Sequence, residues 1–229
     1  MSGGKATNIT FNCNNATVGG AVYNAEVSFD SRFKNNLPND TFNATFFEKE
    51  YLKTFSDLNA LINGKDDEVV YLNDDYTFDI AYDFEFMSGI NINRNVTVIG
   101  NANTIDANYN ARVFMVLDGN VTFSNIRFVN AKSGDGSVIN GKSTSINCTF
   151  INNSAENYYG GVMYNGYAIY CTFINNRAYY GGAMYYGSAV NCTFINNSAD
   201  RCGGAIHYGS SAVNCTFINN SADYGGAIY

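Results

Sequence analysis

The stretch that decides the fold runs from 147 to 155 and reads Asn-Cys-Thr-Phe-Ile-Asn-Asn-Ser-Ala. The same phrase, with small changes, begins again at Tyr170, Asn191 and Asn214, and a variable turn and a pair of glycines follow each copy. Successive phenylalanines of the phrase lie 23, 21 and 23 residues apart. A period near 22 residues that holds two short strand patterns and two Gly- or Asn-rich turns is typical of a solenoid. The repeat therefore predicts an all-β chain wound as a parallel β-helix, with about 22 residues per coil.

A cysteine occupies the same place in every copy of this phrase. It lies two residues after an aliphatic residue and two before the phenylalanine, as in Ile146, Cys148 and Phe150. Alternate residues of a strand share a face, so these side chains point into the coil, and the residues between them point out. We expect a column of buried thiols that act as small apolar fillers, with one or two disulfides or a metal site as alternatives. The column consists of Cys148, Cys171, Cys192 and Cys215, whereas Cys13 and Cys202 fall in turns and are given no role.

Two further columns follow from the alignment of the copies. The two asparagines after each phenylalanine mark a corner of the coil, because asparagine tolerates positive φ and stacked amides hydrogen-bond along the axis. After each glycine pair, an aliphatic residue is expected to face inward and the next residue outward. The outward position forms a predicted surface aromatic stripe of Tyr23, Tyr164, Tyr185, His207 and Tyr229. Such a stripe serves recognition of a sugar or a protein, or it only stabilises the sheet face.

The chain divides into three expected segments. The repeat is already present near the N-terminus, because Phe11 and Phe33 lie 22 residues apart. It is interrupted by a turn cluster around Pro38, the only proline of the chain. The expected segments are partial β-helix coils at 1–36, a linker at 37–53 and a capped parallel β-helix at 54–229.

A short amphipathic α-helix is expected near 54–63. Leu58, Leu61 and Ile62 have the spacing of one helix face. The expected capping residues are Thr54 or Ser56 at its start and Gly64 at its end. A parallel β-helix exposes apolar core and unpaired strand edges at each end, so we interpret this helix as a cap.

The last copy of the repeat and the first residues of the chain are nearly in phase. Read on from Tyr229 into the N-terminus, Phe11 is the eleventh residue, whereas nine or ten residues separate the corresponding positions of the regular coils. Residues 1–36 are therefore expected to complete the C-terminal end of the solenoid, in cis or in trans, or to be the remnant of a preceding domain. In trans the contact is head-to-tail and joins copies of the chain into a filament.

The charge balance is acidic, with 13 Lys and Arg against 20 Asp and Glu, a net charge of −7 and a pI near 4.6. Because Lys and Arg form no cluster, we expect no nucleic-acid partner. No apolar run approaches the ~20 residues of a membrane-spanning helix, so direct membrane insertion is not expected either. The first five residues contain no apolar signal core, so the signal of an exported protein would lie upstream.

Candidate catalytic and metal-binding groups are sparse. Only Asp200 and Asp223 share a turn column, where they are a candidate cation site or are simply solvated. The single histidine, His207, lies in the aromatic stripe, and no Ser-His-Asp, Cys-His or phosphate-loop pattern occurs. We therefore expect no enzyme and no cofactor, with a polysaccharide lyase or glycoside hydrolase as the alternative. Sequons that would accept a glycan in an exported chain include Asn8, Asn15, Asn43, Asn95 and Asn120.

The pairing of Phe-Ile-Asn-Asn at 150–153 with Gly-Gly-Ala-Ile at 225–228 resembles the repeat motifs of the chlamydial polymorphic outer-membrane proteins. The wider pattern, with a helix-like stretch at 56–63 and strands at 69–73 and 95–100, is similar to the adhesin-like surface proteins of methanogenic archaea. That likeness implies a right-handed parallel β-helix, an extracellular or cell-surface location and no catalytic residues. It implies a host or neighbour-cell protein or glycan as partner. The alternative is a self-assembling structural fibre subunit whose partner is a second copy of itself.

Overall fold

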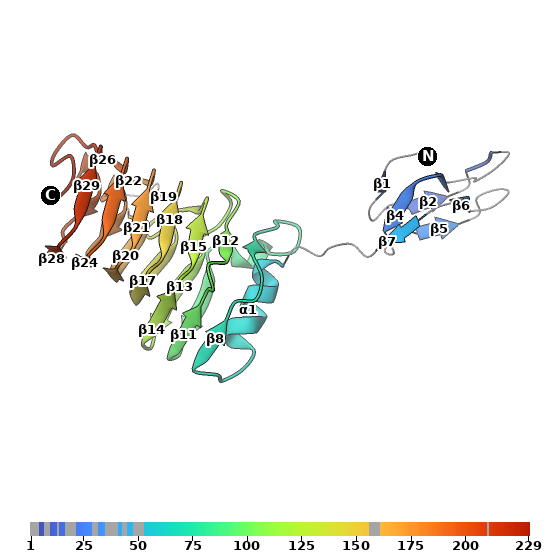
Figure 1. Ribbon diagram of the computed structural model, residues 1–229, viewed down its shortest axis with the longest axis horizontal. Helices are drawn as coiled ribbons and strands as arrows, with labels where there is room; N and C mark the ends of the chain where they lie inside the picture. The colour runs from blue at the N-terminus through green and yellow to red at the C-terminus, as the bar shows by residue number, and fades with distance from the viewer. Residues whose placement is uncertain are drawn as a thin grey trace. The chain divides into compact units, whose positions relative to one another are not determined.

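The computed structural model describes residues 53–229 apart from 156–160 and 210, and within 1–52 it describes 5–6, 10–12, 14–16, 22–28, 32–34, 41–42 and 45–47. The chain forms two compact units, Met1–Tyr51 and Leu52–Tyr229 (Figure 1). Parallel strand pairs build both units, and the second unit holds the candidate functional surface.

The described strands of the first unit pair with partners 19 to 22 residues away in the sequence. These strands are β1 (Lys5–Ala6), β2 (Thr10–Asn12), β3 (Val22–Tyr23), β4 (Glu26–Ser28), β5 (Arg32–Lys34), β6 (Thr41–Phe42) and β7 (Thr45–Phe47). Strands β6 and β7 lie within 37–53 and pair with β3 and β4. The segment predicted as a linker therefore contains two strands of the repeat.

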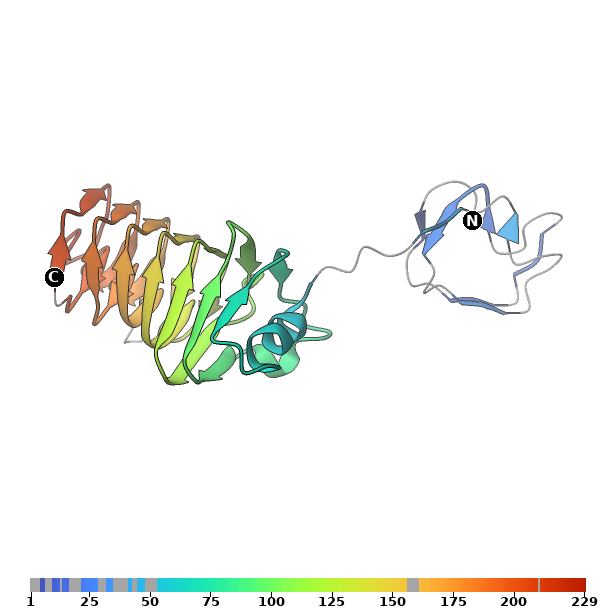
Figure 2. The same cartoon turned by 60° about the horizontal axis from the view of Figure 1, so that its bottom comes forward.

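The second unit is a parallel β-helix, which confirms the predicted fold class (Figures 1 and 2). Its described strands stack coil upon coil into three sheets. The first sheet contains β8 (Val69–Tyr71), β10 (Ile90–Asn93), β11 (Val96–Ile99), β13 (Phe114–Asp118), β14 (Val121–Ser124), β17 (Ile139–Ile146), β20 (Met163–Ile169), β23 (Met184–Tyr185), β24 (Ser188–Val190), β27 (Ile206–His207) and β28 (Ser211–Val213). The second contains β9 (Tyr76–Thr77), β12 (Thr104–Asp106), β15 (Arg127–Val129), β18 (Thr149–Ile151), β21 (Thr172–Ile174), β25 (Thr193–Ile195) and β29 (Thr216–Ile218). The third contains β16 (Lys132–Ser133), β19 (Ser154–Ala155), β22 (Arg177–Tyr180) and β26 (Ser198–Cys202).

Equivalent residues of successive coils lie side by side in these sheets. Phe150 is in register with Phe173, and Phe173 with Phe194. Their fully buried rings stack with centroids 4.6 and 4.8 Å apart. Each coil thus adds the same inward ring to a continuous core, as the sequence spacing predicts.

The asparagine pairs that follow these phenylalanines have two different tasks. The first member, such as Asn175 with φ 54°, turns the chain at the corner. The second member, such as Asn176, is fully buried, and its Nδ2 donates to Oδ1 of Asn197 (2.9 Å) and to the carbonyl oxygen of Phe150 (3.0 Å). Its Oδ1 accepts hydrogen bonds from the backbone N–H and Nδ2 of Asn153 (3.1 and 3.0 Å). The resulting amide ladder consists of Asn153, Asn176, Asn197 and Asn220.

Helix α1 (Phe55–Asn63) covers the end of the second unit at which its coils begin, as predicted for a cap (Figure 2). Its N-cap is Thr54, one of the two predicted residues, and the backbone N–H of Thr54 donates to the carboxylate of Asp57 (3.0 Å). The side chains that it buries are Phe55, Leu58 and Ile62. No helix in the part of the chain that the structure describes has both the length and the apolar character needed to cross a membrane.

The carboxylate of Asp83, which is distant in the sequence, connects helix α1 to the first coils through hydrogen bonds. Asp83 lies just before the 3-10 helix η1 (Phe84–Phe86) and is fully buried. Its carboxylate accepts hydrogen bonds from the backbone N–H groups of Phe55 (3.0 Å) and Ser56 (2.8 Å). An acidic group at a helix N-terminus satisfies free N–H donors and stabilises the helix dipole.

Candidate binding surface

The four predicted core cysteines form a column inside the coils. Cys148, Cys171 and Cys192 are 1% exposed, Cys215 is half-buried, and all are free thiols. The backbone N–H of Cys148 donates to Sγ of Cys171 (3.4 Å), and that of Cys171 donates to Sγ of Cys192 (3.3 Å). The adjacent Cys148 thiol and burial raise the pKa of Cys171 to about 12, so this thiol stays protonated and fills space. Cys202 is also buried and free, and Cys13 lies outside the described residues.

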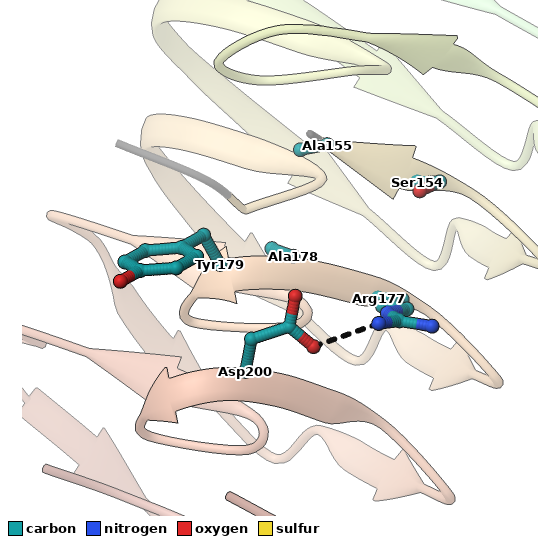
Figure 3. A pocket seen from close by; sticks show the side chains of 6 residues that line it. All are labelled: Ser154, Ala155, Arg177, Ala178, Tyr179 and Asp200. Carbon is teal, nitrogen blue, oxygen red and sulfur yellow. Dashed lines mark hydrogen bonds and ion pairs between the residues drawn. The ribbon is translucent and has the colours of Figure 1, made fainter. Parts of the chain in front are cut away.

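The two aspartates of the candidate cation site are exposed to solvent. The carboxylate of Asp200 forms an ion pair of 2.9 Å with Nη2 of Arg177 on the preceding coil (Figure 3). The Asp200 carboxylate therefore has a cationic side-chain partner, and the cation site of Asp200 and Asp223 stays a prediction. The ion pair borders a depression of about 330 Å³ that is lined by Ser154, Ala155, Arg177, Ala178, Tyr179 and Asp200. The described residues contain no group of three or more His, Cys, Asp or Glu side chains that would hold a metal ion.

The predicted aromatic stripe is only partly a surface feature. Tyr185 and His207 are each 2% exposed, and Tyr164 is half-buried. Tyr229 and, in the first unit, Tyr23 are exposed. The prediction of surface rings is therefore wrong for Tyr185 and His207. The physical reason is that the chain turns a corner at the next residue, which is Tyr186 after Tyr185 and Tyr208 after His207. The rings of these two corner tyrosines pack against Tyr185 and His207.

These rings form what we call the tyrosine cluster, with an inner and an outer row. The inner row is Tyr164, Tyr185, His207 and Tyr229, and the outer row is Tyr186 and Tyr208. Tyr164 stacks on Tyr185 (centroids 5.7 Å apart), and Tyr186 stacks on Tyr208 (5.4 Å). Between the rows, Tyr186 meets Tyr185 edge-to-face at 4.6 Å, and Tyr208 lies 4.2 Å from His207. The outer row thus covers Tyr185 and His207 of the inner row, while 46% of Tyr186 and 55% of Tyr208 stay exposed.

The backbone of the outer row has an unusual conformation. Tyr186 has a φ of 53° and Tyr208 a φ of 49°, both in the left-handed region. In the preceding coil Asn165 occupies the same corner with a φ of 60°. Asparagine adopts this conformation readily, whereas other residues with a Cβ lose about 1–2 kcal/mol there. This outer row was not predicted from the sequence. The available signal was a tyrosine directly before a glycine, at Tyr186-Gly187 and Tyr208-Gly209.

The single histidine is enclosed by tyrosine rings. The centroid of His207 lies 4.8 Å from that of Tyr180, 5.2 Å from Tyr185 and 5.4 Å from Tyr229. Its Nδ1 is buried and has no hydrogen-bond partner. Burial lowers the pKa of His207, so the neutral imidazole packs among the tyrosines.

Three of the predicted glycosylation residues fall within the described part of the chain. Asn15 in the first unit and Asn95 and Asn120 in the second are exposed. Oδ1 of Asn95 accepts a hydrogen bond from the backbone N–H of Asn120 (2.8 Å). Asn8 and Asn43 lie outside the described residues.

The repeat itself has a counterpart in a known family. The Chlamydia polymorphic membrane protein (Chlamydia_PMP) repeat matches residues 191–208 and 214–229. These ranges contain the last two copies of the repeat phrase, and His207 and Tyr208 lie within the first range. The match covers a small part of the chain, so it shows similar repeats and not a shared whole. A search of curated proteins and a search of solved structures found no significant match.

Proposed function

We propose that the chain is a non-catalytic, adhesin-like rod displayed at a cell surface, and that its tyrosine cluster contacts a protein or a glycan of a host or neighbouring cell. The parallel β-helix and the match to the repeat of a membrane protein family are consistent with a surface protein of this kind. In a stack of coils the inward columns maintain the core, so outward residues vary without disturbing it. The residues that differ from the coil pattern are therefore the first candidates for contact with a partner.

The observation that carries the proposal is the outer row of the tyrosine cluster. Tyr186 and Tyr208 keep about half of their surface in solvent although they hold an unfavourable backbone conformation. Asn165 turns the same corner without that cost. Tyrosine combines a large apolar body with a hydroxyl group and is enriched in protein interfaces. Because the two rings stack on each other, one face of each ring is occupied, and the rest of the exposed ring surface with its hydroxyl group would meet the partner.

Adhesion of the purified chain tests this proposal. Beads coated with the chain are offered to a panel of cells and to a glycan array. We expect Tyr186→Ser together with Tyr208→Ser to lower binding at least about tenfold, as for the central residues of an interface. The matched control is Tyr170→Ser, since Tyr170 is 61% exposed and also has a positive φ (55°) but has no described ring contact with the cluster. Equal binding by the double variant and the control would overturn the role of the cluster, and breakdown of a polysaccharide would overturn the non-catalytic assignment.

A self-assembling fibre subunit is the second candidate, because parallel strand pairing builds both units of the chain and would equally join the coils of two copies. Unpaired strand edges are templates for further strands. In a head-to-tail contact, residues 1–36 of one copy would pair with strands in the second unit of another. Sedimentation and electron microscopy compare the full chain with a chain lacking 1–36: oligomers that vanish on deletion support this candidate, and a concentration-independent monomer rejects it.

A further inference from the structure

The segment that follows strand β9 lies beside helix α1 (Figures 1 and 2). It contains four large apolar side chains that are exposed to solvent. The exposed fractions are 54% for Ile80, 62% for Tyr82, 71% for Phe84 and 39% for Met87. We call these four residues the cap patch. Exposed apolar side chains gathered in one place mark a contact site, whereas single ones need no explanation.

The backbone of the cap patch is held in place, so the exposure does not come from a loose loop. The buried carboxylate of Asp83 accepts a hydrogen bond from the backbone N–H of Asp79 (2.8 Å), in addition to those from helix α1. The backbone N–H of Phe86 donates to the carbonyl oxygen of Asp83 (2.7 Å), and the Phe86 side chain packs against the core. On the far side, Nη1 of Arg112 donates to the carbonyl oxygen of Ser88 (3.0 Å). The segment is thus fixed at its start, its centre and its end.

In a typical surface loop the polar side chains are exposed and the apolar ones are buried, whereas residues 82–84 have the opposite arrangement. Asp83 is buried and caps helix α1, whereas its neighbours Tyr82 and Phe84 are exposed. Capping alone is satisfied by any polar residue at these two exposed positions. Burial of a phenylalanine side chain is favourable, and Phe84 forgoes that gain while it is exposed. Contact with a partner recovers that energy.

The exposed charged residues of the cap patch segment and of helix α1 are acidic. The run 79–87 contains Asp79 and Glu85, both exposed, and no Lys or Arg. Asp57 is exposed on the adjacent helix, and burial, followed by the carboxylates of Asp74 and Asp57, raises the pKa of nearby Tyr76. A second copy of the patch, or an anionic lipid surface, would place like charges against this rim.

We propose that the cap patch docks a basic protein segment that carries apolar side chains. Its apolar residues would cover Tyr82 and Phe84, and its Lys or Arg residues would face the acidic rim. This division between an apolar centre and a charged rim is the ordinary anatomy of a protein interface. The proposal concerns the capped end of the second unit and is independent of the tyrosine cluster.

The test uses two labelled helical peptides with the same leucine pattern, one with lysine and one with glutamate at the polar positions. Fluorescence anisotropy with the full chain measures their affinities at low and at high salt. We expect the lysine peptide to bind at least about tenfold more tightly than the glutamate peptide, and Phe84→Ser to weaken it about tenfold. Glu85→Gln should weaken it about two- to threefold and reduce the salt dependence. Tyr170→Ser, with a similar exposed fraction, is the control and should bind like the parent chain.

Several results would overturn the proposal. Equal binding of both peptides, or lysine-peptide binding that Phe84→Ser leaves unchanged, would mean unspecific attraction to an acidic chain. Self-association that Phe84→Ser abolishes would show that the cap patch binds a second copy of the chain. Binding to zwitterionic vesicles that Phe84→Ser abolishes would show that the cap patch binds a membrane. An unchanged thermal midpoint of Phe84→Ser shows that a loss of binding does not come from unfolding.

Discussion

Replacing Asn176 with alanine removes one rung of the amide ladder and should be among the most damaging polar substitutions in the chain. The Asn176 side chain takes part in four hydrogen bonds and is fully buried. Its loss leaves the backbone N–H of Asn153 without an acceptor, whereas Nδ2 of Asn153 keeps the carbonyl oxygen of Phe128 (3.2 Å). A stranded buried donor costs about 1–3 kcal/mol, and the loss of the two bonds that Nδ2 of Asn176 donates contributes about 1 kcal/mol each. We therefore expect the free energy of unfolding to fall by about 3–5 kcal/mol.

The neighbouring residue supplies the control. Asn175 lies one position earlier, is exposed and has a φ of 54°, which glycine adopts without strain. Asn175→Gly should change the free energy of unfolding by less than about 0.5 kcal/mol. Urea unfolding followed by circular dichroism gives the global values. Amide hydrogen exchange near Asn153 gives the local effect, which is needed because solenoids unfold in stages. A loss below about 1 kcal/mol for Asn176→Ala, or a loss equal to that of the control, would refute the structural role of the ladder.

Three further outcomes are expected. His207→Tyr should remove an acid sensitivity: because burial lowers the pKa of His207, the unfolded chain binds the proton more readily, and stability is lost as the pH falls below about 6.5. Thermal midpoints measured from about pH 7.5 to about pH 5 should fall less in the variant than in the parent chain, and parallel curves would contradict this. Tyr170→Asn should raise the free energy of unfolding by about 0.5–1 kcal/mol, because it relieves a positive φ at an exposed position; a lower value in a urea titration would show that Tyr170 makes a stabilising contact. In the native chain a thiol reagent should label Cys215 well before Cys171, since Cys171 is buried and its pKa is raised to about 12; early labelling of Cys171 by mass spectrometry would contradict the closed column.

The core of the second unit can be predicted from its sequence because each regular coil places the same residue types at the same inward positions. Phe150, Phe173 and Phe194 must point inward, and a spacing near one coil places them in register, so periodicity alone predicts their stacking. Cap position follows in the same way from apolar spacing and a polar residue at Thr54. Asp83 could not be assigned to the cap, because the contact spans 28 residues and no local pattern encodes it.

The candidate surface was harder to predict than the core. Alternation places Tyr185 and His207 outward, yet the next residue turns a corner, and its ring lies over them. The burial of Tyr185 and His207 also depends on rings of the adjacent coils, so the sequence of a single repeat does not reveal it. The cap patch was missed for a related reason: apolar residues such as Phe84 normally signal core, whereas here the polar Asp83 is buried and Phe84 is exposed.

Adhesion of the Tyr186→Ser, Tyr208→Ser double variant tests the central claim most directly, because it changes the exposed rings and leaves the inward columns intact. Bead binding to cells and glycans is measured per folded molecule, with circular dichroism as the check on folding. The account predicts a native spectrum and a loss of binding of at least about tenfold, while Tyr170→Ser binds normally. A double variant that folds and adheres like the parent chain would contradict the claim that this surface makes the contact.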